Sequence, residues 1–166
     1  MGDEVLGFTG HRPEKLGGFN QLNPWATAVR ARMREVILEV KPTAIVSGFA
    51  LGTDQWAAWL AIKEGIYLIA AVPHDGQELI WPRKSQLVYH QLLKQAQEVH
   101  VVSPGPYNPG KMFKRNEWMV ERSTKMCAVW DGSDGGTAHC VGCARKQGLP
   151  IIRIDPREVM PRPRTS

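Results

Sequence analysis

The sequence has no long apolar run and few cysteines. No window of its 166 residues approaches the roughly 18 consecutive apolar residues that a membrane-spanning helix needs. Its first five residues lack the basic and apolar regions of a secretion signal. Three cysteines are an odd number in a chain without such a signal, which disfavours a disulfide framework and favours reduced thiols. We therefore expect a soluble, cytoplasmic protein without a membrane partner.

Too few metal ligands stand together for a structural zinc site. Cys140 and Cys143 form a Cys-x-x-Cys pair, but only His139 lies close by in the sequence. A structural zinc site needs about four ligands, so we expect small buried thiols on a helix face and no metal.

Acidic residues are fewer than basic ones. The sequence has 16 acidic and 21 basic residues, which gives a net charge of +5. The excess is concentrated at residues 30–34 and 111–115 and in a Pro-rich segment, residues 156–166. Such a surplus is compatible with an anionic ligand or with nucleic acid, and is also common on solvated helix faces. Residues 156–166 have too few apolar side chains to pack, so we predict a folded domain over 1–155 and a flexible basic tail.

Short apolar runs alternate with segments of helical periodicity. The runs predict strands at residues 5–8, 43–46, 67–72, 99–102, 126–130 and 149–154. The periodic segments predict helices at residues 24–40, 53–64, 85–96, 111–122 and 138–147. Strands and helices in this order indicate one α/β domain with a doubly wound, mainly parallel sheet and right-handed crossovers.

Glycine-rich loops follow two of the predicted strands. Residues 131–136 read Asp-Gly-Ser-Asp-Gly-Gly and lead into a predicted helix, and residues 47–54 repeat the arrangement. In an open parallel sheet such junctions lie at the carboxyl ends of strands, where loop amides and the helix N-terminus favour a phosphate or carboxylate. The first strand leads into a loop with His11 and Arg12, and the Arg12 guanidinium can reach a phosphate there. Turns of this kind also occur in α/β proteins without any such ligand.

Two segments resemble known nucleotide-binding families. Residues 47–54, Ser-Gly-Phe-Ala-Leu-Gly-Thr-Asp, resemble the S-G-x-A-x-G-x-D segment of the DprA/SMF proteins. Residues 112–119 and 128–137 are similar to the M-x-x-R-K-x-x-M and P-G-G-x-G-T-x-x-E patterns of the LOG phosphoribohydrolases. Both groups belong to the SLOG superfamily of Rossmann-like domains.

The first residues of the chain resemble one branch of this superfamily in particular. Residues 7–13, Gly-Phe-Thr-Gly-His-Arg-Pro, together with Trp81-Pro82 and residues 114–119, Lys-Arg-Asn-Glu-Trp-Met, resemble most closely the YpsA-like branch of that superfamily. The resemblance extends from residue 7 to residue 154. It implies a single-domain Rossmann-like fold that binds a nucleotide, or a nucleotide-derived signal, across the carboxyl ends of the strands.

One position departs from the enzyme pattern. The LOG pattern has a Glu three residues after its Thr, and counted from Thr137 this position is Cys140. A neutral thiol cannot supply the charge that stabilises a developing oxocarbenium ion. If the protein is an enzyme, Asp131, Asp134 or Asp54 is the candidate catalytic carboxylate. Whether it is an enzyme stays open at this point.

The resemblance and the loops together predict a ligand site. Arg115 matches the family's Arg and suits a phosphate contact, whereas Asn116 replaces the family's Lys. Trp81 and Trp118 have polar neighbours and are candidates for stacking on a base, and Asp54 is either a ribose contact or a first-turn carboxylate of its helix. The predicted ligand-binding residues are Gly10, His11, Arg12, Ser47, Gly48, Gly52, Asp54, Trp81, Arg115, Asn116, Asp131, Gly132, Ser133, Gly135, Gly136 and Thr137.

Three functions are consistent with these residues. The first is binding of a nucleotide or nucleotide-derived small molecule for sensing or sequestration, with no other cofactor required. The second is cleavage or transfer at an N-glycosidic bond, as in a phosphoribohydrolase or a nucleoside deoxyribosyltransferase. The third is DprA-like binding of nucleic acid by Arg30, Arg32, Arg34 and the basic tail, although no aromatic residues interleave with these arginines. We also expect a homo-oligomer.

Overall fold

A single six-stranded sheet organises the protein. The structure, a computed structural model, describes residues 2–159. The strands are β1 (Val5–Gly10), β2 (Ala44–Ser47), β3 (Tyr67–Val72), β4 (Glu98–Val101), β5 (Lys125–Val129) and β6 (Ile151–Ile154). Their order across the sheet is β4-β3-β2-β1-β5-β6, and every neighbouring pair is parallel. This confirms the predicted Rossmann-like, doubly wound α/β fold.

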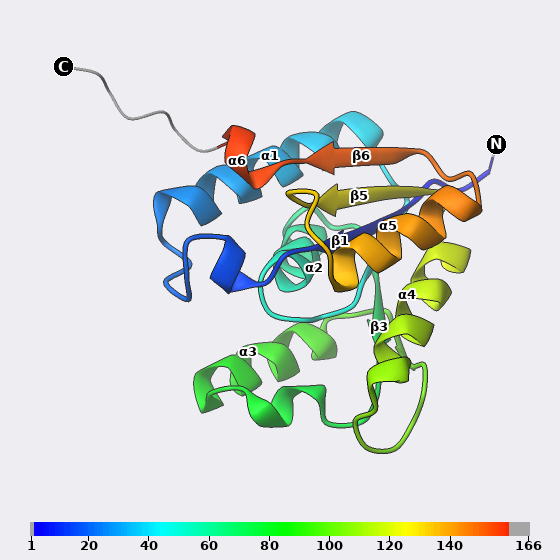
Figure 1. Cartoon of the computed structure of the whole chain (residues 1–166). Helices are drawn as coiled ribbons and strands as arrows, with labels where there is room; N and C mark the ends of the chain where they lie inside the picture. The colour runs from blue at the N-terminus through cyan, green and yellow to red at the C-terminus, as the bar shows by residue number, and fades with distance from the viewer. Residues whose placement is uncertain (1, 160–166) are drawn as a thin grey trace.

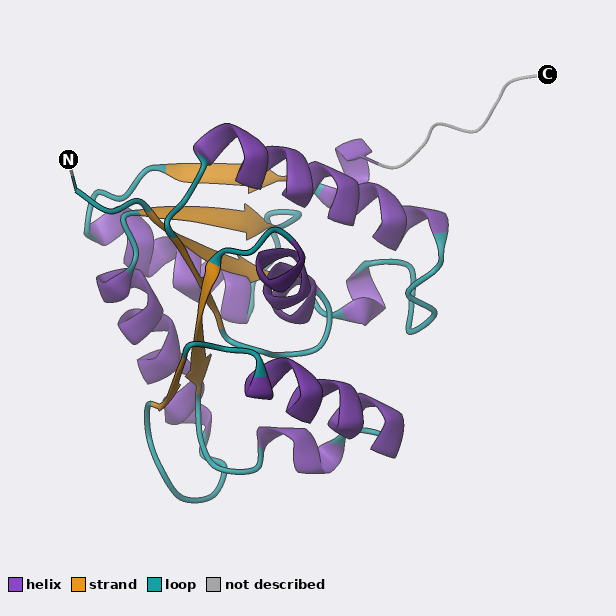
Figure 2. Ribbon diagram, turned by 180° about the vertical axis from the view of Figure 1, so that it is seen from behind, coloured by secondary structure: helices purple, strands orange, loops and turns teal. Residues whose placement is uncertain are grey.

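Helices cover both faces of the sheet (Figures 1 and 2). One face carries α1 (Pro24–Val40), α2 (Thr53–Lys63) and α3 (Arg83–Lys94), and the other carries α4 (Pro109–Arg122) and α5 (Gly136–Lys146). The short helical turns η1 (Pro13–Lys15), η2 (Gln77–Ile80) and α6 (Pro156–Val159) complete the described part of the chain. Within residues 2–159, no helix combines the length and the apolar character needed to cross a membrane.

Alternating side chains of β1 separate the two layers of core. Leu6 and Phe8 are fully buried in the larger cluster beneath α1, α2 and α3. Gly7 points to the opposite face, where a β-carbon would overlap the side chains of Met126 and Ser123. The absence of a side chain at Gly7 therefore lets β1 lie close to β5 and to the end of α4.

The first helix starts where the sequence predicts. Asn23 accepts a hydrogen bond from the Ala26 amide through its side chain (2.8 Å), and Pro24 is the first helical residue. Both residues act as N-terminal signals, because the cap satisfies a free amide and Pro needs no amide partner there.

The two tryptophans of α2 differ in exposure: Trp56 is buried in the core, whereas Trp59 is 47% exposed. The homo-oligomer to which an exposed tryptophan could contribute stays a prediction.

The predicted boundary of the flexible tail lies too early in the chain. Residues 156–159 form α6, which packs against α1, and Pro156 is buried. The Trp25 indole donates a hydrogen bond to the Pro156 carbonyl, and Asp155 accepts hydrogen bonds from the Arg157 amide and guanidinium. These contacts order a segment whose composition alone predicts mobility. The rest of the predicted tail, residues 160–166, lies outside the described residues.

Candidate functional site

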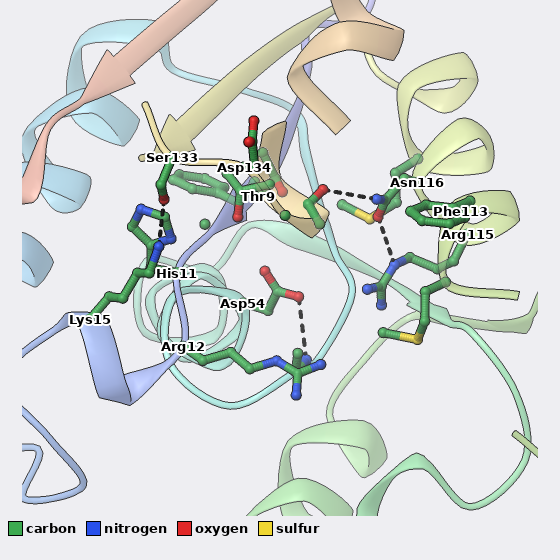
Figure 3. A pocket seen from close by; sticks show the side chains of 18 of the residues that line it. Thr9, His11, Arg12, Lys15, Asp54, Phe113, Arg115, Asn116, Ser133 and Asp134 are labelled. Atoms are coloured by element: carbon green, nitrogen blue, oxygen red, sulfur yellow. Dashed lines mark hydrogen bonds between the residues drawn. The ribbon is translucent and has the colours of Figure 1, made fainter. Parts of the chain in front are cut away.

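A cavity of about 360 Å³ opens at the carboxyl ends of β1 and β5. The chain runs from β1 to β2, β3 and β4 on one side, whereas β5 and β6 lie on the other side of β1. Ligands of open α/β sheets bind at such a reversal of strand order, and the volume is within the range of small-molecule sites. The cavity is therefore the candidate functional site of the molecule (Figure 3).

Four segments line the cavity: the end of β1 with η1, the start of α2, one face of α4, and the loop from β5 into α5. Their lining residues are Phe8, Thr9, Gly10, His11, Arg12, Glu14, Lys15, Ala50, Asp54, Met112, Phe113, Arg115, Asn116, Met119, Ser133, Asp134, Gly135, Gly136 and Thr137. The structure thus brings together most of the predicted site. It leaves six predicted residues outside the lining: Ser47, Gly48, Gly52, Trp81, Asp131 and Gly132.

The loop between β5 and α5 presents an uncapped helix N-terminus to the cavity. Gly135 occupies the cap position with φ 140°, and no side chain caps the first amides of α5. Gly136 has no atom within 4 Å of the position of a β-carbon, so the space beside these amides is open. Free amides and the positive end of the helix dipole together favour an anion at this place.

Asp131 stabilises this loop from outside the cavity. Its carboxylate accepts a hydrogen bond from the Ser133 amide (2.9 Å) and lies 3.0 Å from Nε2 of His11. Hydrogen bonds from the Ser133 side chain and backbone, with smaller contributions from His11 and Lys15, hold the pKa of Asp131 well below its usual range. Asp131 is therefore ionised, and it shapes the loop without lining the cavity.

His11 and Lys15 connect the first loop to the β5–α5 loop. His11 is buried, and its Nε2 accepts a hydrogen bond from the Asp131 amide (2.9 Å). Burial lowers the pKa of His11 against the opposing attraction of Asp131, so the imidazole is neutral at neutral pH. The Lys15 ammonium donates a hydrogen bond to the Ser133 hydroxyl. These bonds hold η1 against one rim of the cavity.

Arg115 is turned inward more than the sequence indicates. Its side chain is buried, and Nη1 donates to the carbonyl oxygens of Gly48 (2.9 Å) and Ala71 (3.4 Å). Its Nε donates to Oδ1 of Asn116 (3.2 Å). Burial lowers the pKa of Arg115, and the nearby Asp54 carboxylate opposes this effect. Nη1 thus joins α4 to the ends of β2 and β3, and Nε is used within α4 by Asn116.

Asn116 connects α4 to the start of α5. Its Nδ2 donates to the Gly136 carbonyl (3.2 Å) and to Nδ1 of His139 (3.2 Å), while its Oδ1 accepts from Arg115. An amide can donate and accept at once, which a lysine at this position could not do. Asn116 therefore fixes the position of the glycine loop relative to α4.

Asp54 is a buried carboxyl group at the floor of the cavity. Its Oδ2 accepts from the Ala50 amide (3.3 Å), and its backbone carbonyl accepts from the Ser47 hydroxyl (2.6 Å). Its Oδ1 accepts no hydrogen bond from any residue of the described part of the chain. Burial raises the pKa of Asp54, and Arg115, the Ala50 amide and Arg12 oppose this rise. One carboxyl oxygen thus remains available to a ligand.

Gly48 and Gly52 lie behind the lining and allow close packing. A β-carbon on Gly48 would overlap the Arg115 guanidinium and the Asp54 carboxyl group. Gly52 has φ 87°, which favours glycine, and a β-carbon there would overlap the His11 carbonyl. Both glycines therefore shape the site from behind the residues that face the cavity.

The predicted base-stacking tryptophans lie away from the cavity. The Trp81 ring packs edge-on against Tyr89, with 5.4 Å between ring centroids, and the Trp118 ring lies 4.8 Å from the His100 ring. Both side chains are partly buried against the core. Each has polar neighbours in sequence, but the fold turns each ring toward other side chains.

Cys140 lies under the cavity and does not line it. It is fully buried with Val120, Met126 and Ala144, and burial raises its pKa to about 12. Its thiol is therefore neutral. Among residues 2–159, no three His, Cys, Asp or Glu side chains are placed to hold a metal ion.

Sequence reasoning did not assign several residues of the cavity wall. Met112 and Met119 stand three and four positions from Arg115, so helical spacing puts them on the same face of α4. That spacing was a usable signal for the apolar part of the wall. Lys15 and Phe113 had no such signal, because η1 reads as an irregular loop and Phe113 as one exposed residue of a polar helix.

The sequence of the chain matches a known protein family. The model of the YspA SLOG family (YpsA) matches residues 6–148. The chain belongs to the YspA SLOG family. It is 34% identical over 144 residues to the SPbeta prophage-derived protein YoqJ of Bacillus subtilis, a match that covers 76% of this chain and 84% of YoqJ. It is 31% identical over 163 residues to a UPF0398 protein of Shouchella clausii, covering 91% of this chain and 86% of that protein.

Solved structures show that this SLOG chain shares its fold with DNA processing protein A (DprA). DprA from Streptococcus pneumoniae matches with a TM-score of 0.66 and 17% identity over 92% of this chain. A DprA structure from Helicobacter pylori, described for its single-stranded DNA binding mode, matches with a TM-score of 0.64 and 17% identity over 91% of this chain. This chain spans 50% of the pneumococcal DprA chain and 65% of the other. The likeness concerns the fold.

Proposed function

We propose that the protein binds a nucleotide or nucleotide-derived small molecule in the cavity, with an anionic group at the start of α5. The observation that carries the proposal is the uncapped N-terminus of α5, which opens into a cavity at the reversal of strand order. Membership of the SLOG family supports it, because the family resemblance implies a ligand of this class.

The charges around the cavity fit an anionic ligand that also carries hydroxyl groups. Arg12 is exposed, lines the cavity and donates no side-chain hydrogen bond to any residue of the described range 2–159. Lys15 lies on the same side, beside Ser133. The available oxygen of Asp54 can accept a hydrogen bond from a sugar hydroxyl. A phosphorylated sugar therefore finds donors for its phosphate and an acceptor for its hydroxyls in one cavity.

The test places a carboxylate beside the α5 amides. Gly136→Asp has room for its side chain and needs no unusual backbone, so it leaves the fold intact. Gly142→Asp is the matched control, since Gly142 also lies in α5 with nothing within 4 Å of its β-carbon position and is outside the cavity lining. Calorimetric titration of each variant with the 5′-monophosphates of adenosine, guanosine, cytidine and uridine measures the effect.

We expect binding by wild type and by Gly142→Asp, and a loss of at least tenfold in affinity for Gly136→Asp through like-charge repulsion. Equal affinities for the two variants would exclude the α5 N-terminus from the site. No binding of any nucleotide by wild type, extended to dinucleotides and cyclic nucleotides, would refute the proposed function.

The position of Asp54 supports a second candidate function, the cleavage of an N-glycosidic bond. Cys140 and Asp131 do not line the cavity, whereas the buried Asp54 and the exposed Asp134 do. A carboxyl group whose pKa is raised by burial suits a general acid that protonates a leaving base. Chromatography of free base released from nucleoside monophosphates and deoxynucleosides tests this candidate. Turnover by wild type that Asp54→Asn abolishes would support it over simple binding, whereas absence of turnover would exclude it.

The likeness to the Helicobacter pylori DprA structure supports a third candidate, single-stranded DNA binding. The contacts of the α1 arginines do not support their predicted role in DNA binding, because each arginine already interacts with another side chain. Arg34 pairs with Glu64 (2.9 Å), Arg32 pairs with Glu35 (3.2 Å), and the Arg30 guanidinium lies over the Trp56 ring. Fluorescence anisotropy of a labelled oligothymidine at several salt concentrations tests the candidate. Saturable, salt-dependent binding would support it.

A further inference from the structure

An exposed aromatic ring stands at the wall of the cavity. Phe113 of α4 is 45% exposed although it is a large apolar side chain, and it lines the cavity together with Met112. Single exposed apolar side chains are common on protein surfaces, but ligand pockets are lined mainly by apolar and aromatic side chains. The position of Phe113 in the cavity lining, rather than its exposure alone, therefore makes the ring a surface for a ligand.

Two neighbours hold this ring in place. The rings of Phe113 and His139 lie 4.3 Å apart between centroids, with 47° between their planes. His139 in turn accepts a hydrogen bond at Nδ1 from Asn116, which also binds the Gly136 carbonyl. His139 is outside the cavity lining, so it supports the ring from behind. The position of Phe113 is thereby linked to the start of α5.

The cavity is polar at one side and apolar at the other. Figure 3 shows Lys15 and Ser133 on one side, Phe113 on the opposite side, and Asp54 between them. A cation, a hydroxyl acceptor and an aromatic surface thus line one cavity. The start of α5, where the proposed function places the anionic group, is joined to the Phe113 side through Asn116 and His139.

No other aromatic residue of the described range offers a comparable surface to the cavity. Phe8 also lines it but is fully buried. Tyr107 and Phe19 are exposed and lie outside the lining. We infer that Phe113, with Met112 beside it, forms a subsite that stacks on a planar aromatic heterocycle, the base of the ligand. This inference rests on the proposed function and assigns the base end of the ligand within it.

The test compares a whole nucleotide with the same sugar phosphate without its base. The probes are the four 5′-ribonucleoside monophosphates and ribose 5-phosphate, titrated by calorimetry. Phe113→Ala removes the ring from an exposed helical position, and Phe113→Trp restores an aromatic surface. Tyr107→Ala is the matched control, because it removes an exposed aromatic ring outside the lining.

We expect Phe113→Ala to weaken nucleotide binding by about 5- to 150-fold, the range for loss of one base–aromatic stack. Ribose 5-phosphate affinity stays unchanged, Phe113→Trp recovers nucleotide binding, and Tyr107→Ala behaves as wild type. Circular dichroism of each variant confirms that the fold is retained.

Three results would overturn the subsite. These are an unchanged nucleotide affinity in Phe113→Ala, an equal loss for nucleotide and ribose 5-phosphate, and a loss that Phe113→Trp does not recover. In each case wild type still binds nucleotide, so the proposed function stands without this subsite. Absence of nucleotide binding by wild type refutes the proposed function and the subsite together.

Discussion

Truncation of the two cavity arginines, Arg115 and Arg12, should affect different properties of the protein. Arg115 is buried, and its guanidinium joins α4 to the carbonyl oxygens of Gly48 and Ala71 and also donates to the side chain of Asn116. Arg12 lines the same cavity but is exposed, and its guanidinium has no hydrogen-bonding partner among residues 2–159. Arg115→Ala therefore perturbs the fold, and Arg12→Ala perturbs ligand binding.

The expected magnitudes follow from the hydrogen bonds. Arg115 makes hydrogen bonds of 2.9 Å to Gly48, 3.2 Å to Asn116 and 3.4 Å to Ala71. A hydrogen bond with one charged partner contributes about 1.5–3 kcal/mol, so losing the two shorter bonds costs about 3–6 kcal/mol of unfolding free energy. This is a large part of the roughly 5–15 kcal/mol that stabilises an ordinary domain. Arg12→Ala should change stability by no more than about 0.5 kcal/mol and weaken nucleotide binding by about 10- to 150-fold.

Urea unfolding followed by tryptophan fluorescence measures the stabilities, and calorimetry measures nucleotide affinity. Arg115→Lys serves as an intermediate variant, because it keeps the positive charge near Asp54 but loses the planar donor geometry. Equal unfolding free energies for Arg115→Ala and Arg12→Ala would refute the structural role of Arg115. Unchanged nucleotide affinity in Arg12→Ala would remove Arg12 from the site.

Three further predictions concern the supports of the site. Asn116→Leu leaves the buried Nε of Arg115 without its acceptor and should lower the unfolding free energy by about 1–3 kcal/mol in urea titrations; an unchanged midpoint would contradict the role of this amide. Because burial lowers the pKa of His11 below 6.5, the unfolded chain takes up a proton that the folded chain does not, so stability is highest above pH 6.5 and falls as the pH falls below it. His11→Gln should flatten that part of the stability profile, and an unaltered slope would count against a neutral buried His11. Cys127 and Cys140 are buried with pKa values raised to about 12, so iodoacetamide at neutral pH should label Cys143 first and the other two only on unfolding; labelling of Cys140 as fast as Cys143 would show that the thiol is accessible.

The sequence predicted the sheet because parallel strands are buried on both faces. Their continuous apolar runs stand out between Gly and Pro residues, and all six predicted strands form. The boundaries were less certain. β1 continues through Thr9 and Gly10 because both residues pair with β5, which two polar or small residues do not indicate.

The meeting of the loops was predictable, but the directions of the side chains were not. Parallel strands bring their carboxyl ends to one edge, so the loops after β1, β2 and β5 had to lie together. Whether Arg115 faces a ligand or the Gly48 carbonyl depends on the packing of α4 against β2 and β3. The same packing turns Trp118 toward His100 and leaves Phe113 at the cavity. Helical position alone does not separate these outcomes.

The carboxyl groups of the cavity support binding more than cleavage. Asp131 is ionised but faces His11 and Lys15 outside the lining, and Asp134 is exposed at the rim. Asp54 lies inside, where burial raises its pKa and so favours the neutral form. The Asp54 carboxyl group can hold a sugar hydroxyl, and a raised pKa suits it to donate a proton to a leaving base. A thiol at position 140 cannot supply the charge that stabilises an oxocarbenium ion, since Cys140 is neutral and buried beneath the floor. Cleavage would therefore depend on the carboxyl groups of Asp54 and Asp134, whereas binding of an anion needs only the amides and cations that already line the cavity.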